Sequence, residues 1–68
     1  MDKDKILQMS DEILLSFINA KLRVYYKSLP DLCEDLNLDP DVIIDRLKAI
    51  NYIYSAQLNQ FVHKDSII

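Results

Sequence analysis

Residues 28–40 read SLPDLCEDLNLDP, and this stretch contains two helix starts with one helix stop between them. Ser28 is a good N-cap, and the proline two positions later falls in the first turn, where its missing N–H costs nothing. Asn37 tolerates the left-handed conformation that ends many helices. Asp39 then caps a second helix that begins with Pro40. The stretch therefore predicts two short helices joined by a tight turn, which is the helix-turn-helix arrangement.

Apolar residues in both predicted helices recur at helical spacing, so each helix has one face suited to a core. In the first helix they stand at i, i+3, i+4 and i+7, as expected for one face of a helix. The residues that this spacing places in the core are Leu29, Leu32, Cys33 and Leu36 in the first helix, and Ile43, Leu47 and Ile50 in the second.

A longer helix is predicted before this stretch, over residues 11–26. Ser10 precedes two acidic residues and a long apolar pattern, and a serine followed by acids is typical of a helix start. Residues 1–9 open with alternating charges, and we expect them to form a loosely ordered start. The helical part then consists of one long helix and two short ones.

After Asn51, a second asparagine at an expected helix end, the pattern changes from helical spacing to alternation. The β-prone residues there predict strands at residues 52–55 and 59–63. The alternative is a fourth helix over residues 55–61, which contain nothing that resists helix. We favour the hairpin. The predicted fold class is therefore mainly α, a single domain over residues 1–68 with a three-helix, helix-turn-helix core and a short C-terminal β-hairpin, like a winged helix.

The long first helix is apolar over roughly twice the width that an ordinary surface helix needs. Two interpretations explain the excess. In one, the N-terminal residues Ile6, Leu7 and Met9 fold back and cover it. In the other, the excess surface contacts a second copy or a protein partner through Leu15, Leu22 and Tyr26.

The third helix would be the recognition helix of a DNA-binding protein, and its expected outward face opposes that role. Asp41 and Asp45 should lie on this face together with Lys48. A helix in the major groove meets phosphates on both sides, so the two carboxylates would face a negative field. Nucleic acid is therefore a disfavoured partner.

Basic residues gather instead near the end of the long helix, at Lys21, Arg23 and Lys27. Positive charge at that end complements the negative end of the helix macrodipole, which is a structural explanation for them. The functional alternative is a small patch that contacts an anion or nucleic acid.

Composition excludes several kinds of chemistry. The 68 residues carry a net charge of −3 and no glycine, which removes phosphate-binding loops and dinucleotide fingerprints. One cysteine and one histidine, Cys33 and His63, do not make a zinc site, and no carboxylate pair has catalytic spacing. We expect no catalytic residue, cofactor or metal. No apolar run suits a membrane span, and a lone cysteine on a core face suits the cytoplasm.

A set of short motifs runs through the chain from residue 11 to residue 61. They comprise Leu15-Ser16, Asn19, Lys21-Leu22-Arg23, Tyr26, Ser28-Leu29, Leu32-Cys33, Asp35-Leu36, Tyr52, Tyr54 and Asn59-Gln60-Phe61. In this pattern the chain resembles a family of short bacterial proteins described only as a domain of unknown function. Val24 and Asn51 depart from the pattern, where an acid and a glycine are expected. The resemblance implies a bacterial source and no particular activity.

These observations favour a small interaction or regulatory module that self-associates or binds a protein partner. The alternative is a DNA-binding transcriptional regulator that uses the hairpin and the basic residues. We expect no enzymatic activity, because the sequence indicates no pocket with a perturbed acid or thiol.

Overall fold

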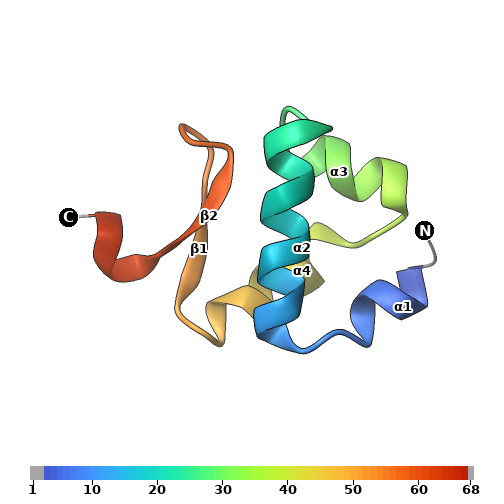
Figure 1. Cartoon of the computed structure of the whole chain (residues 1–68), viewed down its shortest axis with the longest axis horizontal. Coiled ribbons are helices and arrows are strands. Elements are labelled where there is room, and N and C mark those ends of the chain that lie inside the picture. The colour runs from blue at the N-terminus through green and yellow to red at the C-terminus, as the bar shows by residue number, and fades with distance from the viewer. Residues whose placement is uncertain (1–2, 68) are drawn as a thin grey trace.

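The computed structural model describes residues 3–67, and it is mainly helical with a short C-terminal hairpin, as predicted (Figure 1). The helices within this range are α1 (Lys3–Leu7), α2 (Asp11–Val24), α3 (Leu29–Leu36) and α4 (Pro40–Lys48). Strands β1 (Tyr52–Ser55) and β2 (Gln60–His63) follow, and then a 3-10 helix (Lys64–Ile67).

Side chains cap the three predicted helices where the sequence places their starts. The hydroxyl oxygens of Ser10 and Ser28 each accept a hydrogen bond of 3.3 Å from the backbone N–H three residues further on. The carboxylate of Asp39 accepts one of 2.9 Å from the N–H two residues further on. These bonds satisfy N–H groups that have no partner within the helix itself.

Asparagine takes the left-handed backbone positions in this glycine-free chain. The φ angles of Asn37 and Asn51 are 57° and 69°, and these residues follow α3 and α4 as expected. A third asparagine, Asn59, has a φ of 52° in the hairpin loop. Asparagine tolerates this conformation better than most residues that carry a Cβ.

The core lies where α2, α3 and α4 meet the inner face of the hairpin. The buried residues are Ile6, Leu14, Ile18, Leu22, Leu29, Leu32, Cys33, Leu38, Ile43, Leu47 and Phe61. The core predicted for the two short helices is confirmed, although Leu36 and Ile50 are only half-buried against it.

Two features of the N-terminal half differ from the prediction. Helix α2 ends at Val24, with Tyr25 as its C-cap, rather than at Tyr26. The expected loose start is instead the short helix α1, because Ile6 is fully buried in the core while the charged residues around it stay exposed. The first interpretation of the long apolar helix is therefore correct for Ile6, and Met9 packs half-buried against the core, but Leu7 is 37% exposed.

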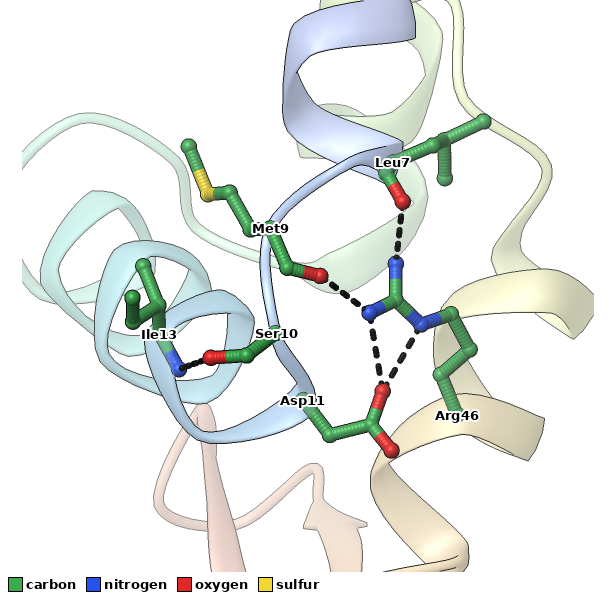
Figure 2. A network of polar contacts seen from close by, with 6 residues as sticks. All are labelled: Leu7, Met9, Ser10, Asp11, Ile13 and Arg46. Carbon is green, nitrogen blue, oxygen red and sulfur yellow. Dashed lines mark hydrogen bonds and ion pairs between the residues drawn. The ribbon is translucent and has the colours of Figure 1, made fainter.

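Arg46 of α4 fixes the segment between α1 and α2 (Figure 2). Its guanidinium donates hydrogen bonds to the backbone carbonyl of Leu7, at 2.8 Å, and to that of Met9. It also forms an ion pair with Asp11, with 2.8 Å between Nη2 and Oδ1, and its Nε donates to the same oxygen at 2.9 Å. A planar guanidinium is suited to such a set of fixed acceptors. We call Arg46, Asp11, Leu7 and Met9 the N-terminal clasp.

The predicted hairpin is confirmed, and the alternative helix over residues 55–61 is wrong. The strands β1 and β2 pair antiparallel, with Tyr54 opposite Phe61 and Ser55 opposite Gln60. Residues 56–59 form the loop between the strands, so the second strand begins one residue later than predicted. The side-chain oxygen of Ser55 accepts a hydrogen bond from the backbone N–H of Leu58 within this loop.

Amide side chains attach β2 to α2. The side chain of Asn19 donates to the backbone carbonyl of Phe61 at 3.0 Å and accepts from its N–H at 2.7 Å, as a neighbouring strand would. The side chain of Gln60 donates to the backbone carbonyl of Asn19 at 2.9 Å. These bonds fix the position of the hairpin along α2.

Asn59 in the hairpin loop completes this attachment. Its side-chain N–H groups donate to the carbonyls of Leu22 and Tyr26, at 3.0 and 2.9 Å, and so satisfy carbonyls at the end of α2. Its oxygen accepts a hydrogen bond of 2.7 Å from the hydroxyl of Tyr54, which itself accepts from the N–H of Leu29 at the start of α3. We call Asn19, Tyr54, Asn59 and Gln60 the hairpin anchor.

Candidate functional site

The three residues predicted to form a partner surface do not lie on one exposed face. Leu22 is only 2% exposed and belongs to the core, and Leu15 is half-buried against it. Tyr26 is half-buried, and its hydroxyl donates to Asp35. The chain's own packing therefore occupies the predicted surface. The apolar arc of α2 is wider than one face, and its side chains alone do not indicate which part of it turns inward.

Helix α2 keeps an apolar surface on its other side, which the sequence analysis missed. Ile13 and Val24 are 59% and 67% exposed, Ala20 is exposed, and Phe17 is half-buried. At 100° per residue these four side chains fall within an arc of roughly 60°. We call Ile13, Phe17, Ala20 and Val24 the α2 stripe. Their i, i+4, i+7, i+11 spacing is present in the sequence, but it merges there with the spacing of the core residues.

Two charged residues border the α2 stripe on one flank, Glu12 near the start of the helix and Arg23 near its end. Both side chains are exposed. The ion pairs found over residues 3–67 are Arg46 with Asp11 and His63 with Asp65, so Glu12 and Arg23 have no partner of this kind there. A surface of apolar residues with unpaired charges beside it suits an interaction with another protein.

A cleft of about 460 Å³ opens between the C-terminal half of α2 and α3. It is lined by Phe17, Lys21, Tyr25, Tyr26, Asp35 and Leu36. A neighbouring hollow of about 600 Å³ shares Tyr25, Tyr26 and Asp35 with the cleft and extends to Lys27, Asp31 and Glu34. We call the cleft and the hollow together the α2–α3 groove.

Aromatic rings and charges lie side by side in the α2–α3 groove. The ammonium nitrogen of Lys21 is 4.8 Å from the ring centroid of Tyr25 and 5.5 Å from that of Phe17, which are cation–π distances. The Tyr26 hydroxyl donates a hydrogen bond of 2.5 Å to the Asp35 carboxylate. This bond raises the pKa of the Tyr26 phenol above its ordinary value, with burial and the charge of Asp35 acting in the same direction.

The predicted basic patch of Lys21, Arg23 and Lys27 is divided in the structure. Lys21 points its ammonium over the rings of the groove, and Lys27 lines the neighbouring hollow. Arg23, two residues after Lys21, faces a direction roughly 160° away around the helix. On α4, Asp41 and Asp45 are exposed, as the sequence analysis expected.

In the described part of the chain, Cys33 and His63 belong to different elements, α3 and β2. Cys33 is 3% exposed, and burial, with a smaller effect from the charge of Asp39, raises the pKa of its thiol to about 11. Such a thiol stays protonated at neutral pH, so it packs rather than reacts. In the part of the chain that the structure describes, no group of histidine, cysteine and acidic side chains is placed to hold a metal ion. The helices of that part are also too short and too polar to cross a membrane.

His63 lies at the end of the hairpin, beside Asp65 and Tyr52. Its Nδ1 is 3.6 Å from a carboxylate oxygen of Asp65, and its ring meets the ring of Tyr52 edge-on at 5.3 Å. The tyrosines of the hairpin serve packing and the hairpin anchor, since the ring of Tyr54 also packs against that of Phe61, with 5.4 Å between centroids and 52° between the ring planes.

These elements define a small, mainly helical domain in which α2, α3 and α4 are followed by a hairpin. Residues 8–61 match the family model of a domain of unknown function, DUF4250, and the chain belongs to this family. The resemblance stated from the short motifs is thereby confirmed. No curated protein and no solved structure matches the chain.

Several of the short motifs quoted from the sequence coincide with contacts that hold the fold. Asn19, Tyr26, Tyr54, Asn59 and Phe61 are among the residues that carry the resemblance, and all of them take part in the attachment of the hairpin. The motifs that carry the resemblance therefore include the residues that hold the hairpin in place.

Proposed function

We propose that this domain is a small cytoplasmic protein-interaction module, without enzymatic activity, that self-associates through the α2 stripe. The observation that carries the proposal is the exposure of Ile13 and Val24 on one side of the longest helix. Contiguous exposed apolar surface often marks an interaction site. In Figure 1, α2 crosses in front of α4, and no described element lies over its near side.

The α2 stripe is complementary to itself when two copies of α2 run antiparallel. A two-fold axis that passes between residues 18 and 19 places Ile13 opposite Val24 of the second copy. The same axis places Phe17 opposite Ala20 of the second copy, so that a large side chain meets a small one. Equivalent surfaces that fit each other in this way make a closed, two-fold interface. The antiparallel direction also brings opposite ends of the helix macrodipoles together.

The charges beside the stripe favour the same direction. Glu12 and Arg23 lie on one flank near opposite ends of α2. In an antiparallel pair each Glu12 lies near Arg23 of the second copy, whereas in a parallel pair the two charged flanks lie on opposite sides of the interface and do not meet. An exposed ion pair contributes about 0.2–1 kcal/mol, so these pairs set the direction more than the affinity. The stripe is small, and we expect weak association with a Kd on the order of 0.1 mM.

Sedimentation equilibrium of the whole chain tests the proposal. The wild type should show a monomer–dimer equilibrium at millimolar concentration. The double variant Ile13→Gln with Val24→Gln should be monomeric, with a free energy of unfolding changed by less than about 1 kcal/mol because both residues are exposed. The matched control is Ile44→Gln, an exposed apolar position on α4, which should leave the dimer intact. A strictly monomeric wild type would contradict the proposal.

Charge reversal tests the antiparallel direction. Glu12→Arg and Arg23→Glu should each weaken the dimer, because each places like charges together. The variant with both changes should restore the wild-type affinity. If the double reversal fails to restore it while the stripe variant still abolishes association, the self-association stands and the direction of pairing is wrong.

A DNA-binding regulator is the second candidate, and the order of elements favours it. Helices α3 and α4 are joined by residues 37–39, and the hairpin follows as a wing would. The exposed carboxylates of Asp41 and Asp45 on α4 and the net charge of −3 oppose this function. A mobility shift with random duplex that weakens with salt and is lost in Lys27→Ala would support it. No shift at low salt would dismiss it.

A further inference from the structure

The wall of the α2–α3 groove that α3 provides is acidic. Helix α3 reads LPDLCEDL and contains three carboxylates and no basic residue. Asp31, Glu34 and Asp35 all line the groove, and none of them forms an ion pair with the described part of the chain. Close carboxylates with low-dielectric walls around them attract a cation and repel an anion.

The opposite side of the groove combines aromatic rings with two lysines, Lys21 and Lys27. Tyr25 is 69% exposed at the end of α2, although a ring of this size gains much from burial. Exposed aromatic residues of this kind are enriched among the residues that dominate binding energy at protein interfaces. Leu36 and Phe17 add apolar surface beside it.

Lys21 shows that the ring faces in this groove accept a cation. Its ammonium lies over both Tyr25 and Phe17 at 4.8 and 5.5 Å. A lysine or arginine from another molecule would find the exposed ring of Tyr25 together with the carboxylates of Asp31 and Glu34, which form no ion pair with the described part of the chain. A neighbouring apolar residue would find Leu36 and the ring edges.

We infer that the α2–α3 groove binds a basic segment of a partner protein, in which lysine or arginine alternates with apolar residues. The carboxylates of α3 pair with the cations, and Tyr25 packs on the apolar part of the segment. The groove is open along α3, which suits an extended or helical peptide better than a small molecule that must be enclosed. The site lies apart from the α2 stripe except for Phe17, and it does not depend on self-association.

Fluorescence anisotropy with a defined probe tests the inference. The probe is a short labelled peptide of alternating lysine and leucine, and its control is the same peptide with glutamate in place of lysine. The lysine peptide should bind the whole chain, and the glutamate peptide should not. Tyr25→Ala should weaken binding of the lysine peptide while circular dichroism shows an unchanged fold.

Two double variants separate a groove from general attraction to a negative protein. Asp31→Asn with Glu34→Gln removes two negative charges from the groove, and it should weaken binding about tenfold. Asp41→Asn with Asp45→Asn removes two negative charges from α4, and it should change binding less than about twofold. Equal losses in the two double variants would overturn the inference, as would absence of binding. Binding of the polyamine spermine as tight as that of the peptide would overturn it too.

The outcome is independent of the proposed self-association. The variant with Ile13→Gln and Val24→Gln should bind the lysine peptide as well as the wild type does. If a wild-type chain that is strictly monomeric binds the peptide, the result supports the groove as a binding site and contradicts the proposed self-association. If the wild type dimerises and binds no peptide, the self-association stands and the inference about the groove is wrong.

Discussion

The hairpin anchor and the N-terminal clasp perform the same task with different chemistry. Both attach a distant segment to the helices through side chains that satisfy backbone groups. The hairpin anchor uses neutral amides and a phenol in half-buried positions. The clasp uses one ion pair whose side chains, Arg46 and Asp11, are 24% and 33% exposed. The anchor should therefore be insensitive to salt, while the contribution of the clasp should be partly screened.

The largest expected effect is at the hairpin anchor. Asn59→Ala should lower the free energy of unfolding by about 2–4 kcal/mol, because the carbonyls of Leu22 and Tyr26 lose their donors and the φ of 52° becomes unfavourable. Urea denaturation measures the loss. Asn59→Gly is the control, since glycine accepts this φ without cost. If Asn59→Gly recovers the full stability, the side-chain bonds contribute nothing and the anchor is wrongly described.

A smaller effect is expected at the clasp. Arg46→Met should cost about 1–3 kcal/mol, because two carbonyls lose a charged donor and Asp11 loses its partner. The difference between variant and wild type should shrink at high salt, and amide exchange in α1 should accelerate. Arg46→Lys keeps the charge and should recover only part of the loss. A salt dependence as large for Asn59→Ala would remove the contrast between the two regions.

A single cap should matter less than either region. Asp39→Ala should cost about 1 kcal/mol through the lost hydrogen bond at the start of α4. It should also lower the pKa of the Cys33 thiol, since the charge of Asp39 helps to raise it. Thermal denaturation and the pH dependence of alkylation measure these effects. A neutral result in denaturation would show that α4 does not depend on its cap.

The smallest expected effect is a change in how stability depends on pH, and it concerns Cys33. The pKa of its thiol rises on folding from 9.0 to about 11, so the folded chain keeps a proton that the unfolded chain releases. The stabilisation is complete below pH 9 and is lost as the pH rises toward 11. Cys33→Ala should lower stability at every pH through the lost packing, but with a shallower decline between pH 9 and 11. An identical slope in the variant would contradict the linkage.

Local features of the fold could be predicted from the sequence because they depend on neighbouring residues. Ser10, Ser28 and Asp39 each cap a helix by bonding to an N–H two or three residues away. Asn37 and Asn51 end helices through their own backbone angles. The predicted helices, the hairpin and most of the core followed from such signals.

The clasp and the anchor could not be predicted in this way. Asn19 bonds to a residue 42 positions further along the chain, and Arg46 bonds to one 37 positions earlier. These contacts exist only once the helices have docked, and no local pattern encodes the docking. The buried Ile6 belongs to the same class, because α1 is too short to show a helical period of its own.

The exposed residues of the α2 stripe could not be predicted from the sequence either, although they all lie on one helix. Leu22 and Val24 are both apolar and only two residues apart, yet one is 2% and the other 67% exposed. The sequence indicated an excess of apolar surface on α2. Only the position of α3, α4 and the hairpin decides which residues form that surface.

The two hydrogen bonds that Asn59 donates to the carbonyls of Leu22 and Tyr26 have a consequence for how the chain unfolds locally. Helix α2 has no glycine at its end, and its final turn is completed by a side chain from a loop more than thirty residues later. The last turn of α2 and the hairpin should then open as one cooperative unit. Protection of their amides against hydrogen exchange should rise and fall together, while the first turn of α2 follows α1.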